Sequence, residues 1–112
     1  AWVATLGKGL ILMNQKDSVV GIWQEKHGFN SNIIKRIFLE QKNDVLWAIT
    51  NRSVYKIQNK KLEEVYALPI GYLNDVYVAN DTIWLASSEG LIKMPKREKS
   101  NSMKVVYLTN IW

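Results

Sequence analysis

The sequence of 112 residues has no cysteine, one histidine, two prolines and no long apolar run. The absence of cysteine excludes disulfide bonds, thiolate chemistry and cysteine-ligated metals. No window approaches the roughly 18 continuous apolar residues that form a membrane-spanning helix. No signal peptide is recognisable where the sequence opens, at Ala1 and Trp2. We therefore expect one domain of ordinary length that is held together by packing and hydrogen bonds.

A concentrated patch of one charge is also missing. Lys and Arg number 15 against 10 Asp and Glu, for a net charge of +5. The lysines are scattered, and the one dense basic run, at residues 96–99, contains an acidic residue. Nucleic-acid-binding domains instead gather their basic residues on one face. We interpret the run as a solvated loop, expect no nucleic-acid partner, and assign the excess charge to solubility or to attraction of an anionic ligand.

Strand-forming residues dominate what the sequence does contain, with five Trp, five Tyr and many Val and Ile. Trp2, Trp47 and Trp84 are each followed three residues later by Thr or Ser, then by a turn and an apolar pair. The copies recur about every 40 residues, a period typical of the four-stranded antiparallel blades of β-propellers. Because blades must pack alike, we predict that the three repeated tryptophans fill the space between neighbouring sheets.

Apolar segments separated by turn residues divide the chain into blades. We predict two complete blades, at residues 33–68 and 73–109, after the last three strands of a preceding blade at residues 1–24. Residues 33–40 form an almost continuous apolar run, so we expect an inner strand there that is buried on both faces. The chain is accordingly predicted to be all-β, a β-propeller fragment of about two and a half four-stranded antiparallel blades without helices.

The predicted number of blades has a consequence for assembly. A propeller closes with 4–8 blades, and this fragment has too few to close a ring. We therefore interpret the chain as a piece of a larger propeller. If it is the whole molecule, we expect self-association through its open blade faces.

The turns around these strands carry a further pattern. Residues 80–91 run Asn-Asp, two residues, Trp, two residues, Ser, and then, after two more residues, Gly-Leu. This pattern resembles the two-component-regulator propeller repeat, and residues 26–33 resemble the segment with which that family leads into an inner strand. The likeness extends over essentially the whole chain, although Ala4, Ile49 and Ala86 stand where the family usually has Gly.

The resemblance implies the periplasmic sensor region of a hybrid two-component histidine kinase of the Bacteroidetes type. In that family, tandem propellers precede a β-sandwich domain, a membrane helix and the kinase, so the segment would be the periplasmic part of an inner-membrane protein. The implied ligand is an oligosaccharide or an anionic glycan, and the implied partner is a second sensor subunit. Two alternatives stay open: a propeller scaffold for protein–protein interaction or dimerisation, and a secreted glycan-processing enzyme.

Neither a catalytic set nor a metal site is recognisable in the sequence. His27 lies in a loop rich in Gly and Asn, unlike a phosphoacceptor histidine, which lies on a helix. Glu63 and Glu64 are adjacent on a predicted strand and face opposite sides, so they do not form an acid–base pair. A metal site would need a carboxylate cluster, and no cluster has the spacing of a calcium loop. We expect no enzymatic activity, no metal and no cofactor in this segment.

Candidate ligand-binding residues lie in the turns between the second and third strands of a blade and in the connections between blades. Arg52 is the best candidate, because its guanidinium group makes paired hydrogen bonds to carboxylates or sulfates. The other candidates are Asn51, Lys8, Lys26, His27 and Glu89. Each of these also fits an ordinary solvated turn. Trp23 and Trp112 lie in or after outer strands, where they pack or offer a stacking surface to a sugar or a partner.

Overall fold

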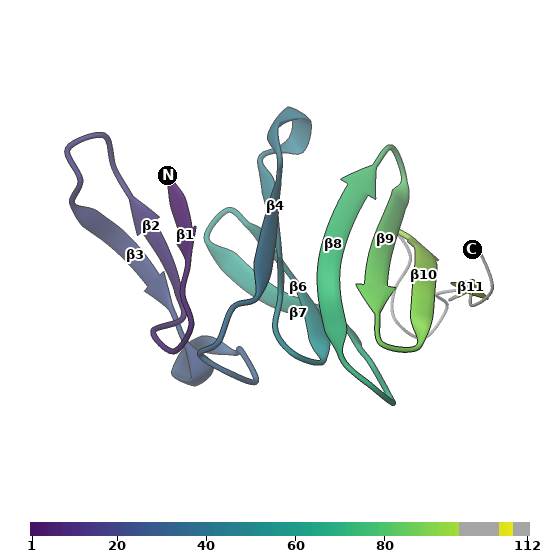
Figure 1. Cartoon of the computed structure of the whole chain (residues 1–112). Coiled ribbons are helices and arrows are strands. Elements are labelled where there is room, and N and C mark those ends of the chain that lie inside the picture. Colours follow the sequence, from purple (N-terminus) through teal and green to yellow (C-terminus); the bar gives the residue numbers. More distant parts are fainter. Residues whose placement is uncertain (97–105, 109–112) are drawn as a thin grey trace.

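Three small antiparallel sheets, set side by side along the chain, make up the structure (Figure 1). The computed structural model describes residues 1–96 together with the backbone of residues 106–108. These residues form eleven strands, the two short 3-10 helices η1 (Glu25–His27) and η2 (Gln41–Asn43), and no α-helix. The all-β prediction is therefore confirmed for the described part of the chain. Most of the predicted loop at 95–102 lies outside that part, as does Trp112.

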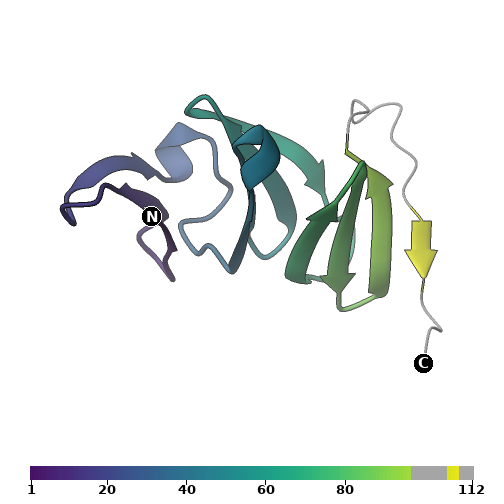
Figure 2. The ribbon, with the colours of Figure 1, turned by 90° about the horizontal axis from the view of Figure 1, so that it is seen from above.

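Each sheet is a meander in which every strand pairs antiparallel with the next strand along the chain. The first sheet consists of β1 (Trp2–Ala4), β2 (Leu10–Met13) and β3 (Val19–Trp23). The second consists of β4 (Arg36–Glu40), β5 (Val45–Ile49), β6 (Ser53–Gln58) and β7 (Lys61–Ala67). The third consists of β8 (Leu73–Ala79), β9 (Thr82–Ser87), β10 (Gly90–Pro95) and β11 (Val106–Leu108). Seen from above, the sheets stand in a row along the molecule (Figure 2).

The hydroxyl group three residues after each repeated tryptophan closes a turn. Thr5 Oγ1 donates to the carbonyl of Gly9 at 2.6 Å, and Ser87 Oγ donates to the carbonyl of Gly90 at 2.7 Å. Each of these oxygens, and Thr50 Oγ1 in the second sheet, also accepts a backbone N–H of its own turn. A short polar side chain that bonds nearby backbone groups stabilises a turn without a larger side chain. The Thr or Ser therefore recurs because the turn recurs.

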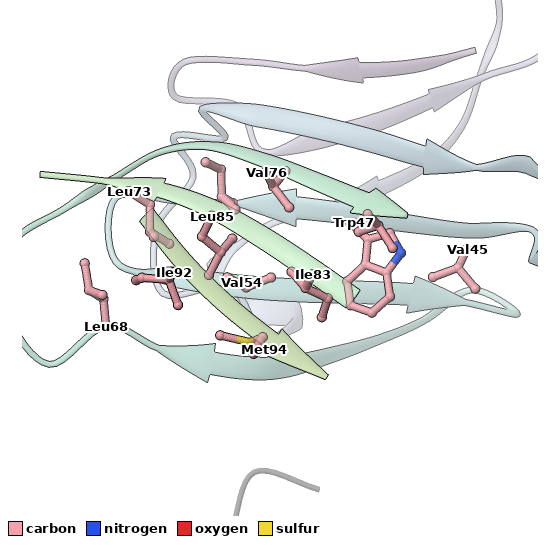
Figure 3. Packing of buried hydrophobic residues seen from close by; sticks show 12 residues of the cluster. Val45, Trp47, Val54, Leu68, Leu73, Val76, Ile83, Leu85, Ile92 and Met94 are labelled. Atoms are coloured by element: carbon pink, nitrogen blue, oxygen red, sulfur yellow. The ribbon is translucent and has the colours of Figure 1, made fainter. Parts of the chain in front are cut away.

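The larger hydrophobic core lies between the second and third sheets (Figure 3). Trp47 and Val54 of the second sheet meet Ile83, Leu85 and Ile92 of the third, and all five are at most 1 % exposed. Alternate residues of a strand point to opposite faces, so an apolar residue at every second position is enough to build this core. Burial of each such side chain stabilises the fold by about 1.5–3 kcal/mol relative to exposure. In a chain without disulfides, this packing is the main cohesion between the sheets.

A second core joins the first and second sheets. Leu10 and Trp23 of the first sheet pack with Leu46 and Tyr55 of the second. The indole of Trp2 lies beside this core, with its ring 5.3 Å from that of Trp23. Because β5 contributes to both cores, all five of its residues are buried. The second sheet is thus covered on both faces, and the outer two sheets are each covered on one.

The inner strand predicted at residues 33–40 is wrong in extent and in burial. The strand begins only at Arg36, and its side chains are exposed or partly buried. Ile33 instead forms a bridge with Leu6, which holds the preceding residues against the first sheet. β4 is an edge strand with a neighbour on one side only, whereas the strand buried on both faces is β5. A long apolar run therefore marked the position of a strand but not the strand with the deepest burial.

The packing role predicted for the repeated tryptophans holds for two of the three. Trp47 is buried between the second and third sheets, and Trp2 packs between the first and second. Trp84 lies partly exposed on the outer face of the third sheet, where the Lys93 ammonium group stands 5.4 Å from its ring centre. Within the described residues no further sheet covers that face. The same sequence position is therefore buried or open depending on whether a neighbouring sheet follows it.

Candidate functional site

The turns and connections where the sequence predicted a ligand site are a tightly bonded part of the fold. The carbonyl of Asn32, in the connection between the first and second sheets, accepts the N–H groups of Gly7 and Gly9 at 3.1 and 2.8 Å. Gly9 has a φ of +82°, and an added Cβ would lie 2.3 Å from the carbonyl oxygen of Trp23. Only glycine fits such a close approach of two backbones. The connection is therefore held against the turn it passes.

Asn30, an exposed residue of that connection, is hydrogen-bonded to three buried residues. Its backbone N–H donates to the Tyr55 hydroxyl at 2.7 Å, its side-chain N–H donates to Ser53 Oγ at 3.1 Å, and its Oδ1 accepts from Thr50 Oγ1 at 2.6 Å. Thr50, Ser53 and Tyr55 are at most 1 % exposed. Burial raises the pKa of the Tyr55 hydroxyl above its usual value of 10.0. The network pairs polar groups that would otherwise be costly to bury.

The predicted ligand-binding residue Arg52 is exposed, and its guanidinium group is engaged in hydrogen bonds within the chain. Its guanidinium group donates to the carbonyl of Leu68 at 3.3 Å and to that of Pro69 at 2.8 Å. The carbonyl of its neighbour Asn51 accepts the N–H of Leu73 at 2.7 Å. These bonds tie the turn between β5 and β6 to the connection that leads into the third sheet. The planar, multi-donor guanidinium suits this carbonyl-bridging task as well as it suits an anion.

The other candidates lie at the same end of the sheets, in two groups. His27 Nδ1 accepts the N–H of Gln24 at 2.9 Å, and Gln24 Nε2 donates to the carbonyl of Lys8 at 3.0 Å. Lys26 is exposed on η1 between these residues. Glu89 is exposed in the β9–β10 turn, beside the connection that Arg52 bonds. The first group therefore borders the first sheet, and Glu89, Asn51 and Arg52 border the second and third.

A lysine that the sequence did not single out joins the second and third sheets. Lys35 Nζ donates to the carbonyl of Leu73, and it stands 5.3 Å from the centre of the Tyr72 ring. The sequence offered no signal for this contact, because the four strands β4 to β7 lie between Lys35 and Leu73 along the chain. Like Arg52, Lys35 stabilises the connection to the third sheet.

The larger described pocket opens at the opposite end of the strands, between the second and third sheets. Its volume is about 540 Å³. Phe38, Leu39 and Val78 line it with apolar surface, and the polar residues around it are Glu40, Gln41, Lys42, Asn43, Asn80, Asp81 and Lys96. The β4–β5 and β8–β9 turns bring these residues together, with Asp44 and Asn80 in the left-handed conformation at φ of 51° and 57°. Asn and Asp tolerate that conformation well, and both turns have the sequence Asn-Asp.

Glu40 is the most strongly bonded polar group of this pocket. Its carboxylate accepts from Lys96 Nζ at 2.5 Å, from Asn43 Nδ2 at 3.0 Å and from Trp47 Nε1 at 3.2 Å. Partial burial opposes ionisation, but these three hydrogen bonds and the charge of Lys96 outweigh it, so the pKa of Glu40 lies below its usual value of 4.5. The side chains of Lys96 and Glu40 are only 11 % and 14 % exposed. The ion pair therefore fixes the pocket wall that the two sheets share.

A smaller pocket, of about 330 Å³, lies between the first and second sheets. Its apolar lining comes from Trp2, Leu12, Leu46 and Ile57, and its polar lining from Asp44, Asn59 and Lys60. Leu39 lines both pockets, so the two hollows adjoin at the β4–β5 turn. Both volumes fall within the roughly 300–1,000 Å³ that ligand pockets occupy.

Sequence reasoning missed both pockets. The candidate residues chosen from the sequence include none of Glu40, Asn43 and Asn80. The one available signal was the repetition of Asn-Asp before Trp47 and Trp84, which places equivalent polar turns at one end of neighbouring sheets. The partnership of Glu40 with Lys96 spans 56 residues and depends on how the sheets pack.

Comparisons with protein-family models, with curated proteins and with solved structures find no match for this chain. Among the described residues, no group of three or more His, Cys, Asp or Glu side chains is placed to hold a metal ion. No helix in the same residues has the length and apolar character needed to cross a membrane.

Proposed function

We propose that this chain is part of a β-propeller in the periplasmic sensor region of a two-component histidine kinase, and that it recognises an oligosaccharide. One observation carries the proposal: three antiparallel meanders, one of three strands and two of four, follow one another along the chain and pack face to face, and each has a Thr or Ser hydroxyl bonded to a backbone N–H of its turn. Stacked antiparallel meanders of this kind are the construction of propeller blades. The resemblance of the turns to the two-component-regulator propeller repeat supports the sensor role.

The pocket between the second and third sheets is the proposed ligand site. Its charged lining consists of Glu40, Lys42, Asp81 and Lys96, two of each sign. Such a lining favours a neutral ligand with many hydroxyl groups over a strongly anionic one, because no excess of positive charge faces it. Side-chain amides and carboxylates supply hydrogen-bond partners for sugar hydroxyls, and Phe38 supplies apolar surface for a sugar ring. The exposed turn residues Lys8, Lys26, His27 and Glu89 are the second proposed position.

The proposed mechanism is non-covalent. A ligand between two sheets contacts both of them, so it stabilises the arrangement of the sheets that fits it best. The kinase chemistry would reside elsewhere in the parent polypeptide, across the inner membrane. The present segment would contribute binding energy and a change in conformational equilibrium.

Calorimetric titration of the 112-residue chain with a panel of neutral and acidic oligosaccharides tests the ligand class and the site. For a sugar that binds, we expect Asn43→Ala to lower the affinity about fivefold or more, since a hydrogen bond in such a site is worth about 1 kcal/mol or more. Asn74→Ala, an exposed Asn on β8, is the matched control and should leave binding unchanged. Binding that survives Asn43→Ala and is lost in Lys26→Ala would instead place the site at the opposite end of the sheets, near Lys26. Failure of every sugar to bind would refute the ligand class.

The signalling role has a separate test, the sequence of the complete polypeptide that contains this segment. A downstream membrane helix followed by kinase motifs is the expected result. A secreted protein that consists of a propeller alone would contradict the sensor role.

A scaffold that binds other proteins is the second candidate function. Exposed apolar residues on the outer faces of the first and third sheets favour it, because single-domain proteins rarely leave such faces uncovered.

A further inference from the structure

One end of the molecule exposes apolar side chains in its turns and connections. This end, here called the connection end, is formed by the β1–β2, β5–β6 and β9–β10 turns and by the connections at residues 24–35 and 68–72 (Figure 1). Four of the exposed large apolar residues in the described part of the chain lie outside strands, and all four are at this end. They are Leu6, Ile70, Ile33 and Tyr72, which are 81 %, 62 %, 49 % and 49 % exposed. Turns and loops are ordinarily polar, so a group of apolar side chains in them indicates a contact surface.

These four side chains are neighbours, although they come from three separate segments. Leu6 pairs with Ile33 in a β-bridge, which joins the first turn to the connection that leads into β4. Two residues after Ile33, the Lys35 ammonium group lies over the ring of Tyr72. Ile70 belongs to the same connection as Tyr72. The group of Leu6, Ile33, Ile70 and Tyr72 is here called the apolar strip.

The backbone fixes the position of the strip. Gly71, between Ile70 and Tyr72, has a φ of +83°, and an added Cβ would lie 2.3 Å from Ser88 Oγ, so this connection is packed against the β9–β10 turn. Ser88 Oγ also accepts the N–H of Tyr72 at 2.9 Å, and Arg52 bonds the start of the same connection. Because these turns are already ordered, a partner that contacts their side chains loses little binding energy in ordering them.

Cations border the apolar strip. Lys8 lies in the same turn as Leu6, and Gln24, which precedes η1, donates to the Lys8 carbonyl, so Lys26 on η1 is close by. Lys8 and Lys26 are both exposed, and within the described residues neither forms an ion pair. The charged residues in the turns and connections of this end are Lys8, Lys26, Lys35 and Arg52 against Glu25 and Glu89. The connection end therefore has a net positive charge beside its apolar side chains.

The shape of this surface favours one kind of partner. Both pockets described above open at the opposite end of the strands, where a small ligand would find a hollow. Side chains as exposed as Leu6 and Ile70 instead protrude from their turns. Protruding aliphatic side chains enter the boundary of a lipid bilayer, Tyr favours the level of the head groups, and lysines attract anionic lipids. The connection end has all three kinds of residue.

We propose that the connection end docks on an anionic lipid surface, with the apolar strip at the interface and Lys8 and Lys26 over the head groups. The strip lies at the ends of the sheets and not on their faces, so the proposal is the same whether or not further sheets flank these three. The pocket between the second and third sheets would then face away from the membrane, open to a ligand in solution. The proposal goes beyond that ligand and does not depend on it.

Co-sedimentation of the 112-residue chain with vesicles tests the proposal, with phosphatidylcholine alone compared with a mixture of phosphatidylcholine and phosphatidylglycerol. We expect binding to the mixed vesicles that weakens as salt is raised from about 0.1 to 1 M, because the screening length falls from about 10 to 3 Å. Ile70→Ser should lower the partition coefficient about tenfold, since it removes an apolar side chain from the interface. Lys26→Ala should lower it about fivefold, the effect of one lysine near such a surface. Both residues are exposed, so circular dichroism should show an unchanged fold.

Matched controls separate the connection end from the rest of the surface. Val20→Ser removes an exposed apolar side chain from β3, and Lys16→Ala removes an exposed lysine from the β2–β3 turn at the opposite end; both variants should bind like the wild-type chain. Binding that is lost in Val20→Ser and kept in Ile70→Ser would overturn the proposal, as would equal binding to the neutral vesicles. Absence of binding to the mixed vesicles would also overturn it and would assign the apolar strip to a protein partner.

Discussion

Replacement of Asn30 by alanine should be among the most destabilising changes outside the hydrophobic cores. The side chain of Asn30 makes two hydrogen bonds, to Thr50 Oγ1 and Ser53 Oγ, and both partners are buried. Asn30 itself is exposed, so water can take the place of its side chain, and each lost hydrogen bond costs its net value of about 0.5–1.5 kcal/mol. The expected loss in free energy of unfolding for the two bonds is therefore about 1–3 kcal/mol. That is a large part of the stability of a small domain.

Urea denaturation, followed by tryptophan fluorescence at two protein concentrations, measures this loss. With a slope of about 2 kcal/mol per molar urea, the midpoint should fall by about 0.5–1.5 M. Asn74→Ala is the matched control, because Asn74 is an exposed Asn on a strand, and we expect a change within about 0.5 kcal/mol. The use of two concentrations separates folding from self-association.

A double-mutant cycle identifies the cause of the loss. If the Thr50 hydroxyl depends on Asn30, the variant with both Asn30→Ala and Thr50→Val should be more stable than the sum of the single effects predicts, by about 0.5–3 kcal/mol. Strict additivity, or a loss for Asn30→Ala no larger than that for Asn74→Ala, would refute the reasoning that the network anchors the connection between the first two sheets.

Three further changes have expected outcomes. Because the folded state lowers the pKa of Glu40, its carboxylate stabilises the fold above pH 4.5 and loses that effect as the pH falls through the lower folded pKa. Glu40→Gln should therefore lower the free energy of unfolding at pH 7 by about 1–3 kcal/mol and reduce the dependence of the urea midpoint on pH below 4.5. The same substitution at the exposed Glu63 is the control and should have neither effect. Because the folded state raises the pKa of Tyr55, the stability of the wild-type chain should fall as the pH rises above 10.0. Tyr55→Phe should remove that part of the alkaline loss and cost about 1–3 kcal/mol at pH 7, whereas the exposed Tyr77→Phe should do neither. Arg52→Ala should lower the thermal midpoint by several degrees, because the carbonyls of Leu68 and Pro69 lose their guanidinium donor. Arg52→Lys should restore only part of the loss, because one ammonium group cannot reproduce the planar guanidinium donors. Full restoration by Lys would contradict the bridging geometry.

Sequence periodicity predicted the strands well, because the determinants of a strand are local. Alternating apolar residues, the Asn-Asp turns before Trp47 and Trp84, and the hydroxyl three residues after each Trp are all visible within about ten residues. Each of them corresponds to a feature of the structure: a buried face, a left-handed turn residue or a hydroxyl-closed turn.

The contents of the candidate site could not be predicted in the same way, because they depend on contacts between sheets. Arg52 has the chemistry of an anion clamp, and only the fold places the carbonyls of Leu68 and Pro69 beside it. Glu40 acquires its partner Lys96 from another sheet. The inner strand at residues 33–40 was misjudged because hydrophobicity reports the tendency to be buried and not which neighbours are present. Trp84 and Trp47 share the pattern of Asn-Asp before the Trp and a hydroxyl residue three positions after it, and their environments differ because only Trp47 has a further described sheet packed on its face.

The covering of the second sheet on both faces has a consequence for how the chain unfolds. In an array where each unit contacts only its neighbours, stability is a sum of unit terms and nearest-neighbour terms. The second sheet has two such terms, and the outer sheets have one each. Opening should therefore begin at either end of the row and reach the middle last, so amide hydrogens of β5 should exchange with solvent more slowly than those of β2 or β9. Slow exchange in the first or third sheet instead would indicate that something beyond these residues already holds that end closed.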